Sequence, residues 1–312
     1  MCDIWKDNGN LKQLTEDDVS TLLFSLKKLG TQEVAMSGGE ALLNQKFFRL
    51  CAILKKEKIK ITLLSTGLSI KKNADLLLQW VDEIIVSLDG DEPLHDAIRN
   101  IPGAFNKLKE GVVHIKNRNP DYRITARTVI HRLNFRGWPA IINEAKQMGL
   151  NQISFLPADV SSHAFNRQMA WSEPKQHEIL ISENELPELK AIVDQIIQNN
   201  AADFQSRFIA EPVAKFREIY QYYAAFYGLD PFPFKKCNAP WVSAVIEADG
   251  GVRPCFFHDV TGNIRDSSLL SILNSDASVN FRKTLNMATN PTCVKCVCSL
   301  NLSPRTTLGN LS

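Results

Sequence analysis

The sequence predicts an α/β fold in which helices cover a parallel sheet, followed by a small cysteine-rich C-terminal domain. Two observations support this prediction. Short apolar, β-branched segments alternate with helical segments over residues 14–157, and five of the seven cysteines lie in the last quarter of the chain. The alternation is typical of parallel strands joined by crossover helices. Right-handed crossovers then allow a barrel, a partial barrel or a doubly wound sheet.

The first helix is predicted over residues 14–30. Thr15 is a suitable N-cap, acidic residues fill the first turn, and Gly30 follows the basic end. Strands are predicted at 33–37, 59–65, 83–89, 122–130 and 152–157. Further helices are predicted at 41–58, 71–80, 105–117 and 138–149. Cys51 lies on the apolar side of the second helix, so we interpret it as a core residue.

The pattern changes near residue 174. Two consecutive helices are predicted, at 183–201 and 210–228, and the segment "DPFPFKK" then marks a break. Beyond it lies a cysteine-rich segment with little helical periodicity. We therefore expect four parts, which are a core over 1–173, a helical connection over 174–230, a cysteine-rich domain over 231–302 and a disordered tail over 303–312.

The composition limits the partners. A formal net charge of +2 gives no overall attraction to nucleic acid or to an anionic membrane, so neither is expected as a partner. No apolar run approaches membrane-spanning length. The first residues are polar and charged, which predicts no secretory signal and a cytoplasmic location.

The cysteines predict metal or cluster binding. An odd, clustered set in a cytoplasmic chain favours ligation over a disulfide framework. Cys237 and Cys255 flank a predicted β-hairpin that turns at residues 249–251, which would bring the two thiols together. Cys293 and Cys296 form a two-ligand loop, and Cys298 is an additional candidate ligand. Four thiolates in two pairs suit either zinc or an iron–sulfur cluster.

The segment "SGGE" follows the first predicted strand. Gly38 and Gly39 would let a ligand approach the backbone closely, and Glu40 can accept hydrogen bonds from a cationic amine. The alternative is a tight strand-to-helix turn with an exposed glutamate.

The strand ends, taken in order, resemble the radical S-adenosylmethionine (SAM) superfamily over roughly residues 2–160. They read "SGGE", "LSTGL", "VSLDGDEPLHDAIRNIPGAF", "TARTVIHRLNF" and "FLPAD". The resemblance implies a partial (β/α)6 parallel barrel. It also implies a Cys-x3-Cys-x-Φ-Cys loop (Φ is apolar), whose three thiolates hold a [4Fe–4S] cluster with one iron open to SAM.

Cys2 fits the third cysteine of that motif, and Met1 fits its apolar position. The first strand and the first two cysteines are absent, so the ligand set of this cluster is incomplete here. We expect the chain to be an N-terminally truncated form of a longer protein. The alternative is a genuine start with Cys2 as a surface thiol.

The resemblance also implies roles for residues at the strand ends. Gly38, Gly39 and Glu40 would hold the SAM amino group. The remaining SAM contacts would be Ser87 and Asp89 at the ribose or methionine portion, Arg127 at the carboxylate and Leu156 at adenine. Ser65 and Thr66 fit the family less well. Arg99 is better interpreted as a structural salt-bridge residue. Of the scattered histidines, His258 is of interest because it follows Cys255 closely.

The pattern Cys-x12-Gly-x4-Cys, then Cys-x2-Cys, resembles the SPASM and twitch extensions of this superfamily. These extensions carry auxiliary [4Fe–4S] clusters, and the cysteine count implies one cluster. The implied ligands are Cys237, Cys255, Cys293, Cys296 and Cys298.

The implied activity is that of a radical SAM iron–sulfur oxidoreductase or maturase. A reduced cluster cleaves SAM to a 5′-deoxyadenosyl radical, which takes hydrogen from a peptide, sugar or small-molecule substrate. A reducing donor such as flavodoxin or ferredoxin is implied as a partner. Two alternatives stay open, a catalytically inactive truncated product and a zinc-stabilised α/β binding protein.

Overall fold

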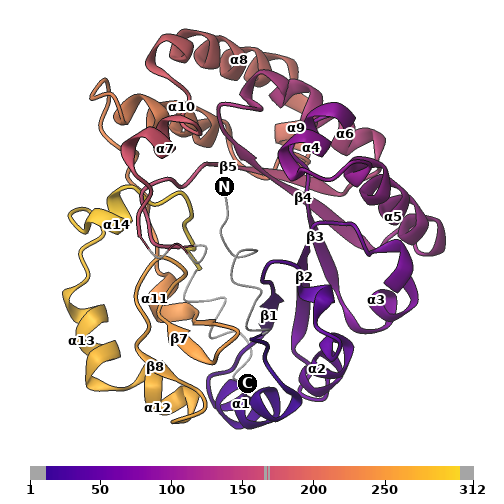
Figure 1. The fold of residues 1–312 in the computed structure, drawn as a ribbon, viewed down its shortest axis with the longest axis vertical. Coiled ribbons are helices and arrows are strands. Elements are labelled where there is room, and N and C mark those ends of the chain that lie inside the picture. The colour runs from indigo at the N-terminus through magenta and orange to yellow at the C-terminus, as the bar shows by residue number, and fades with distance from the viewer. Residues whose placement is uncertain (1–11, 165–166, 168, 303–312) are drawn as a thin grey trace.

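The structure is a computed structural model that describes residues 12–164, 167 and 169–302. A curved sheet has helices along its outer side (Figure 1). Residues 231–302, called the C-terminal segment below, lie opposite the inner side of the sheet (Figure 1). Five strands pair in sequence order, and every pair is parallel. They are β1 (Glu33–Met36), β2 (Lys60–Ser65), β3 (Glu83–Ser87), β4 (Arg123–Ile130) and β5 (Gln152–Pro157). The predicted α/β fold and its five strands are confirmed.

Six α-helices precede or connect these strands. They are α1 (Glu16–Lys28), α2 (Phe47–Lys55), α3 (Ala74–Trp80), α4 (Glu92–Arg99), α5 (Ala104–Arg118) and α6 (Trp138–Gln147). Thr15 is the N-cap of α1, and its hydroxyl accepts a hydrogen bond from the Asp18 backbone N–H, as predicted. Cys51 is fully buried in the core, which also agrees with the prediction.

One local prediction was wrong, and one helix was not predicted. The second helix begins at Phe47 rather than at residue 41, because Glu40 caps a short 3-10 turn over Ala41–Leu43. The sequence analysis also did not include α4. The carboxylate of Asp91 caps α4, and Asn100 ends it in the left-handed conformation (φ 54°).

Side chains alternate between the two faces of each strand. On β4, Ile124 and Ala126 are buried on the outer face against the helices, whereas Arg123 and Arg127 are exposed on the inner face. The alternation therefore gives the sheet an apolar outer face and a more polar inner face.

A second set of helices follows β5. They are α7 (Glu173–His177), α8 (Leu186–Asn199), α9 (Ala201–Gln205) and α10 (Val213–Ala225). The segment between α9 and α10 runs along the free edge of β5. There Ile153 N donates to Phe208 O, and Ala210 N donates to Ile153 O. The ring of Phe216 on α10 stacks on that of Trp138, with 4.8 Å between centroids.

The C-terminal segment contains a small antiparallel sheet and short helices. The elements are α11 (Ala239–Val242), β6 (Val245–Ile246), β7 (Gly251–Arg253), β8 (Gly262–Asn263), α12 (Leu269–Leu273), α13 (Asp276–Thr284) and α14 (Pro291–Val294). β6 and β7 pair antiparallel, which confirms the predicted hairpin. The short helices α11 to α14 were not predicted, because the sequence shows little helical periodicity there. The tail over 303–312 lies outside the described residues, and the predicted domain boundaries stay predictions.

An ion pair joins the C-terminal segment to α1. Arg265 donates from Nε and Nη2 to the two carboxylate oxygens of Asp18, each at 3.0 Å, and Ser25 Oγ accepts from Leu270 N nearby. The hydrogen bond from Arg265 lowers the pKa of Asp18 from its usual 3.8 to about 2. Asp18 thus holds the first helix and the C-terminal segment together.

We predict that Asp18→Asn lowers the free energy of unfolding by about 1 kcal/mol at pH 7, because it weakens a helix cap and a charge-assisted pair. The folded-state pKa is depressed, so this contribution is present above pH 4 and is lost as the pH falls toward 2. Urea unfolding of the parent and the variant at pH 7 and near pH 3 measures it. Asp17→Asn, an exposed neighbour, is the control. Equal stability of the parent and Asp18→Asn at pH 7 would contradict the prediction.

Candidate functional site

The carboxyl ends of the strands carry the predicted SAM-contacting residues. Ser87, Arg127 and Ser154 are paired across β3, β4 and β5, and Leu156 lies one step further along the inner face of β5. Ser87 and Leu156 are half-buried, whereas Arg127 is exposed. Arg127 Nε donates to Ser154 Oγ at 3.2 Å. The structure therefore brings Ser87, Arg127 and Leu156 together on one face.

Glu40 links the loops after β1 and β2. Its carboxylate accepts from Thr66 N at 2.8 Å, from Thr66 Oγ1 at 2.5 Å and from Ser65 Oγ at about 3 Å. Gly38 has a φ of +143°, a conformation that L side chains rarely adopt, and both Gly38 and Gly39 are exposed. Ser65 and Thr66, which fitted the family less well, thus orient the carboxylate.

Asp89 lies in a buried network rather than at the open face. Its carboxylate accepts from Arg99 Nε at 2.5 Å and lies 3.7 Å from His95 Nδ1. His95 is fully buried, and this burial lowers its pKa. The salt bridge expected of Arg99 is therefore present, and it engages the carboxylate that was predicted to approach SAM.

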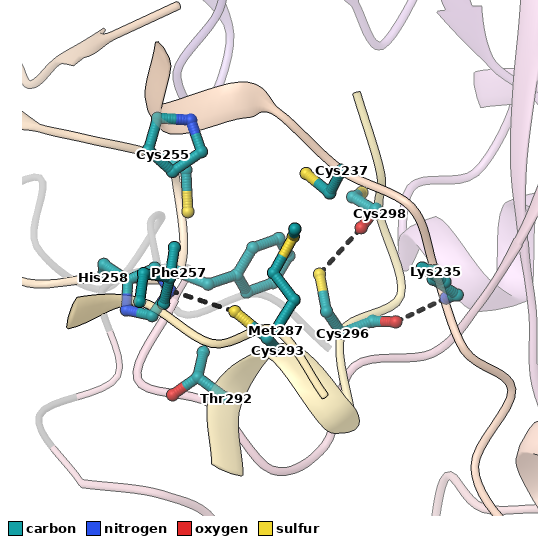
Figure 2. Close-up of a pocket in the computed structure, with 12 residues that line it drawn as sticks. Lys235, Cys237, Cys255, Phe257, His258, Met287, Thr292, Cys293, Cys296 and Cys298 are labelled. Carbon is teal, nitrogen blue, oxygen red and sulfur yellow. Dashed lines mark hydrogen bonds between the residues drawn. The ribbon is translucent and has the colours of Figure 1, made fainter. Parts of the chain in front are cut away.

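Five cysteines line one pocket in the C-terminal segment (Figure 2). They come from the start of the segment, the turn after β7, and α14 with the residues that follow it. They are Cys237, Cys255, Cys293, Cys296 and Cys298. The sequence prediction grouped the same five. Cys2 lies outside the described residues.

The thiols of this pocket are poorly hydrated. Burial raises the pKa of Cys293 to about 11 and that of Cys296 to about 12. Cys296 Sγ donates to Cys298 O at 2.8 Å, and Cys293 Sγ lies 3.5 Å from His258 Nε2. Metal ligands must be deprotonated, so metal binding here would release protons. No group of three or more His, Cys, Asp or Glu within the described ranges stands as a ready site for a single metal ion.

Local hydrogen bonds position the segments that carry the thiols. Asn290 caps α14 and accepts from the Cys293 N–H at 3.1 Å. Arg253 on β7 donates to the His258 carbonyl at 2.8 Å and so holds the turn that carries Cys255. Asn238 N donates to Leu300 O at 2.7 Å, which brings the two ends of the segment together.

Lys235 also lines the pocket, and the sequence analysis did not single it out. Its Nζ donates to the carbonyl of Cys296 and lies 5.9 Å from the centroid of the Tyr222 ring. Burial lowers the pKa of Lys235 to about 8. Its only sequence signal is its position two residues before Cys237.

The pocket lies near the inner face of the sheet. Burial raises the pKa of Cys298, and the positive charge of Arg127 opposes that shift most strongly among its neighbours. Burial also raises the pKa of Glu211 to about 7, and Arg127 again opposes it. Glu211 accepts from Phe155 N at 3.1 Å at the edge of β5. The charge of Arg127 at the strand ends thus acts on Cys298 of the pocket and on Glu211 beside β5.

Models of two families match the sequence. A model described as the radical SAM superfamily matches residues 1–145, and one described as SPASM, an iron-sulfur cluster-binding domain, matches residues 237–297. Both domains imply [4Fe–4S] clusters, and the first implies SAM. Among the described residues, no helix is both long and apolar enough to cross a membrane.

Curated relatives match parts of the chain. An Fe-coproporphyrin III synthase of Methanosarcina barkeri is 25% identical over 57% of this chain and 45% of the relative. An AdoMet-dependent heme synthase of Nitratidesulfovibrio vulgaris is 21% identical over 44% of this chain and 38% of the relative. A protein named probable GTP 3′,8-cyclase, of Methanococcus maripaludis, is 28% identical over 32% of this chain and 35% of the relative. The matched regions span less than half of each relative.

Solved structures share the fold. The structure described as native anSMEcpe with bound AdoMet and Cp18Cys peptide has a TM-score of 0.63 and 16% identity, over 92% of this chain and 81% of that chain. Streptococcus suis SuiB bound to precursor peptide SuiA has a TM-score of 0.59 and 15% identity, over 92% of this chain and 64% of that chain.

Proposed function

Since this chain belongs to the radical SAM superfamily and carries a SPASM domain, we propose that it acts in a radical SAM enzyme. When bound, SAM and its cluster would supply the chemistry of hydrogen-atom removal, and this chain's residues would position the reactants. The observation that carries the proposal is the position of Arg127, which lies on the inner face of the sheet in register with Ser87 on β3 and Ser154 on β5.

Arg127 is proposed to bind the SAM carboxylate. Its side chain is exposed on the inner face, and its hydrogen bond to Ser154 uses only Nε. A planar guanidinium suits a carboxylate because it offers several donors in one plane. Gly38, Gly39 and Glu40 are proposed to hold the amino group, with Ser65 and Thr66 fixing the Glu40 carboxylate. Ser87 and Leu156 are proposed to contact the rest of SAM from the same face.

Asp89 is proposed to act indirectly. Its ion pair with Arg99 and the hydrogen bond from Asn134 Nδ2 to its carbonyl, at 3.1 Å, fix the backbone just after Ser87. A fixed backbone at this strand end would orient Ser87 toward the ligand.

The cysteine pocket fits an iron–sulfur cluster. Its five cysteines line one pocket, and thiolates are the preferred ligands of such clusters. Cys237, Cys255, Cys293 and Cys296 are the proposed ligands, with Cys298 able to replace one of them. Structural zinc bound by the same thiols is the alternative.

A peptide is the proposed substrate, acted on with a reducing donor such as flavodoxin or ferredoxin. Two structures that share the fold are described with bound peptides. The curated relatives are named for tetrapyrrole and nucleotide chemistry, which supports a small molecule as the second candidate.

We predict that Arg127→Gln weakens SAM binding by about tenfold, because it removes a charge-assisted interaction. Arg123→Gln is the matched control. Arg123 lies on the same strand and face, but its Nε pairs with Glu83 at the opposite end of the strand. Equilibrium dialysis with labelled SAM and the anaerobically reconstituted chain measures the affinity. Equal loss in both variants, or no SAM binding by the parent, would contradict the proposal. A 5′-deoxyadenosine assay on the same samples tests whether this chain itself cleaves SAM.

A further inference from the structure

Lys235 is a half-buried cation without a carboxylate partner. Among the residues that the structure describes, no Asp or Glu oxygen lies within ion-pair distance of its Nζ. Its contacts are the carbonyl of Cys296 and the face of the Tyr222 ring. Withdrawing an ammonium from water is costly unless an anion compensates it. The position of Lys235 therefore calls for a negative charge nearby.

The cysteine pocket would supply that charge. Lys235 reaches the pocket from the side of Cys296 and Cys298 (Figure 2). A [4Fe–4S] cluster with thiolate ligands is anionic, and reduction adds one further negative charge. A nearby cation stabilises the reduced form more than the oxidised form, and charge near a cluster is one determinant of its potential.

We propose that Lys235 is a positioning residue that sets the reduction potential of the auxiliary cluster, while its hydrogen bond to the Cys296 carbonyl holds the loop carrying Cys296 and Cys298. This inference rests on the proposed function, because it requires a cluster in the cysteine pocket. It assigns Lys235 to electron transfer at the cluster and not to contact with the substrate.

The test is a redox titration of the 312-residue chain, reconstituted anaerobically and followed by electron paramagnetic resonance at pH 7. Lys235→Met and Lys235→Gln remove the charge, whereas Lys235→Arg keeps it. Lys295→Met is the matched control. Lys295 lies between Cys293 and Cys296, but it is exposed and its Nζ lies 5.7 Å from the centroid of the Phe232 ring.

Loss of the charge is expected to lower the equilibrium constant for reduction about tenfold, which is about 59 mV toward negative potential for one electron. Lys235→Arg and Lys295→Met are expected to match the parent. If only the two uncharged Lys235 variants fail to take up a cluster, the charge acts in cluster assembly and not on the reduction potential, which would overturn the proposal.

Two further results would overturn it. One is an unchanged potential in Lys235→Met or Lys235→Gln with the cluster in place. The other is failure of Lys235→Arg to take up a cluster. This result would show that cluster uptake depends on the shape of the lysine side chain and not on its positive charge. These outcomes differ from failure of the proposed function, in which the parent itself takes up no iron and sulfide.

Discussion

Cys255→Ala or Cys293→Ala is expected to abolish the visible cluster absorbance of the anaerobically purified chain. The two thiols come from different segments, the turn after β7 and helix α14, and both line the pocket. A [4Fe–4S] cluster is held by four ligands. Cys298 shares the loop of Cys296, so it is expected to replace Cys296 and not Cys255 or Cys293, and the loss of either of these two thiols should release the cluster. Absorbance spectra, with iron and sulfide contents, measure the effect.

Two matched variants sharpen this prediction. Cys51→Ala removes a fully buried thiol from α2, far from the pocket in sequence, and should leave the absorbance unchanged. Cys298→Ala should retain most of it, because the other four cysteines are the proposed ligands. Cys2→Ala should also leave the absorbance of this pocket intact. Normal absorbance in Cys255→Ala would show that Cys255 is not a ligand.

Arg167→Met is expected to lower the free energy of unfolding by about 3–5 kcal/mol. Arg167 Nη1 donates to Asp159 Oδ2 at 2.7 Å, and both side chains are almost completely buried. Removing one partner leaves the other charge buried and uncompensated, which explains the size of the effect. This pair also holds the loop after β5, because Arg167 Nη2 donates to the Asp159 carbonyl at 2.8 Å.

Urea unfolding of the parent, each single variant and the Asp159→Asn/Arg167→Met double variant measures the coupling. The double variant should lose less stability than the sum of the single variants. Lys190→Met is the control, because it removes an exposed ion pair with Asp194 and should change stability by less than about 0.5 kcal/mol. Similar losses in Arg167→Met and Lys190→Met would contradict the importance of the buried pair.

The strands were predictable because each is a short run of apolar and β-branched residues. The starts of the helices were harder to predict. Residues 41–43 read as the start of the second helix. The carboxylate of Glu40 just before them is used by Ser65 and Thr66 across the sheet, and the chain forms a 3-10 turn there instead. Such a long-range contact leaves no mark on the local sequence.

The C-terminal helices were missed because they are too short to show periodicity. Their readable signal is the N-cap, supplied by Ser268 for α12, Ser275 for α13 and Asn290 for α14. The cysteine grouping was predictable from spacing. The contact of Lys235 with Cys296 was not, because it joins residues 61 positions apart through packing against Tyr222.

The central claim is that the cysteine pocket of a radical SAM protein holds an auxiliary [4Fe–4S] cluster. The most direct measurement is the iron, sulfide and zinc content of the 312-residue chain carrying Cys2→Ala, expressed with excess iron and purified anaerobically. We predict about four iron and four sulfide per chain, with little zinc. Stoichiometric zinc without sulfide would contradict the claim and would support a structural zinc site in the same pocket.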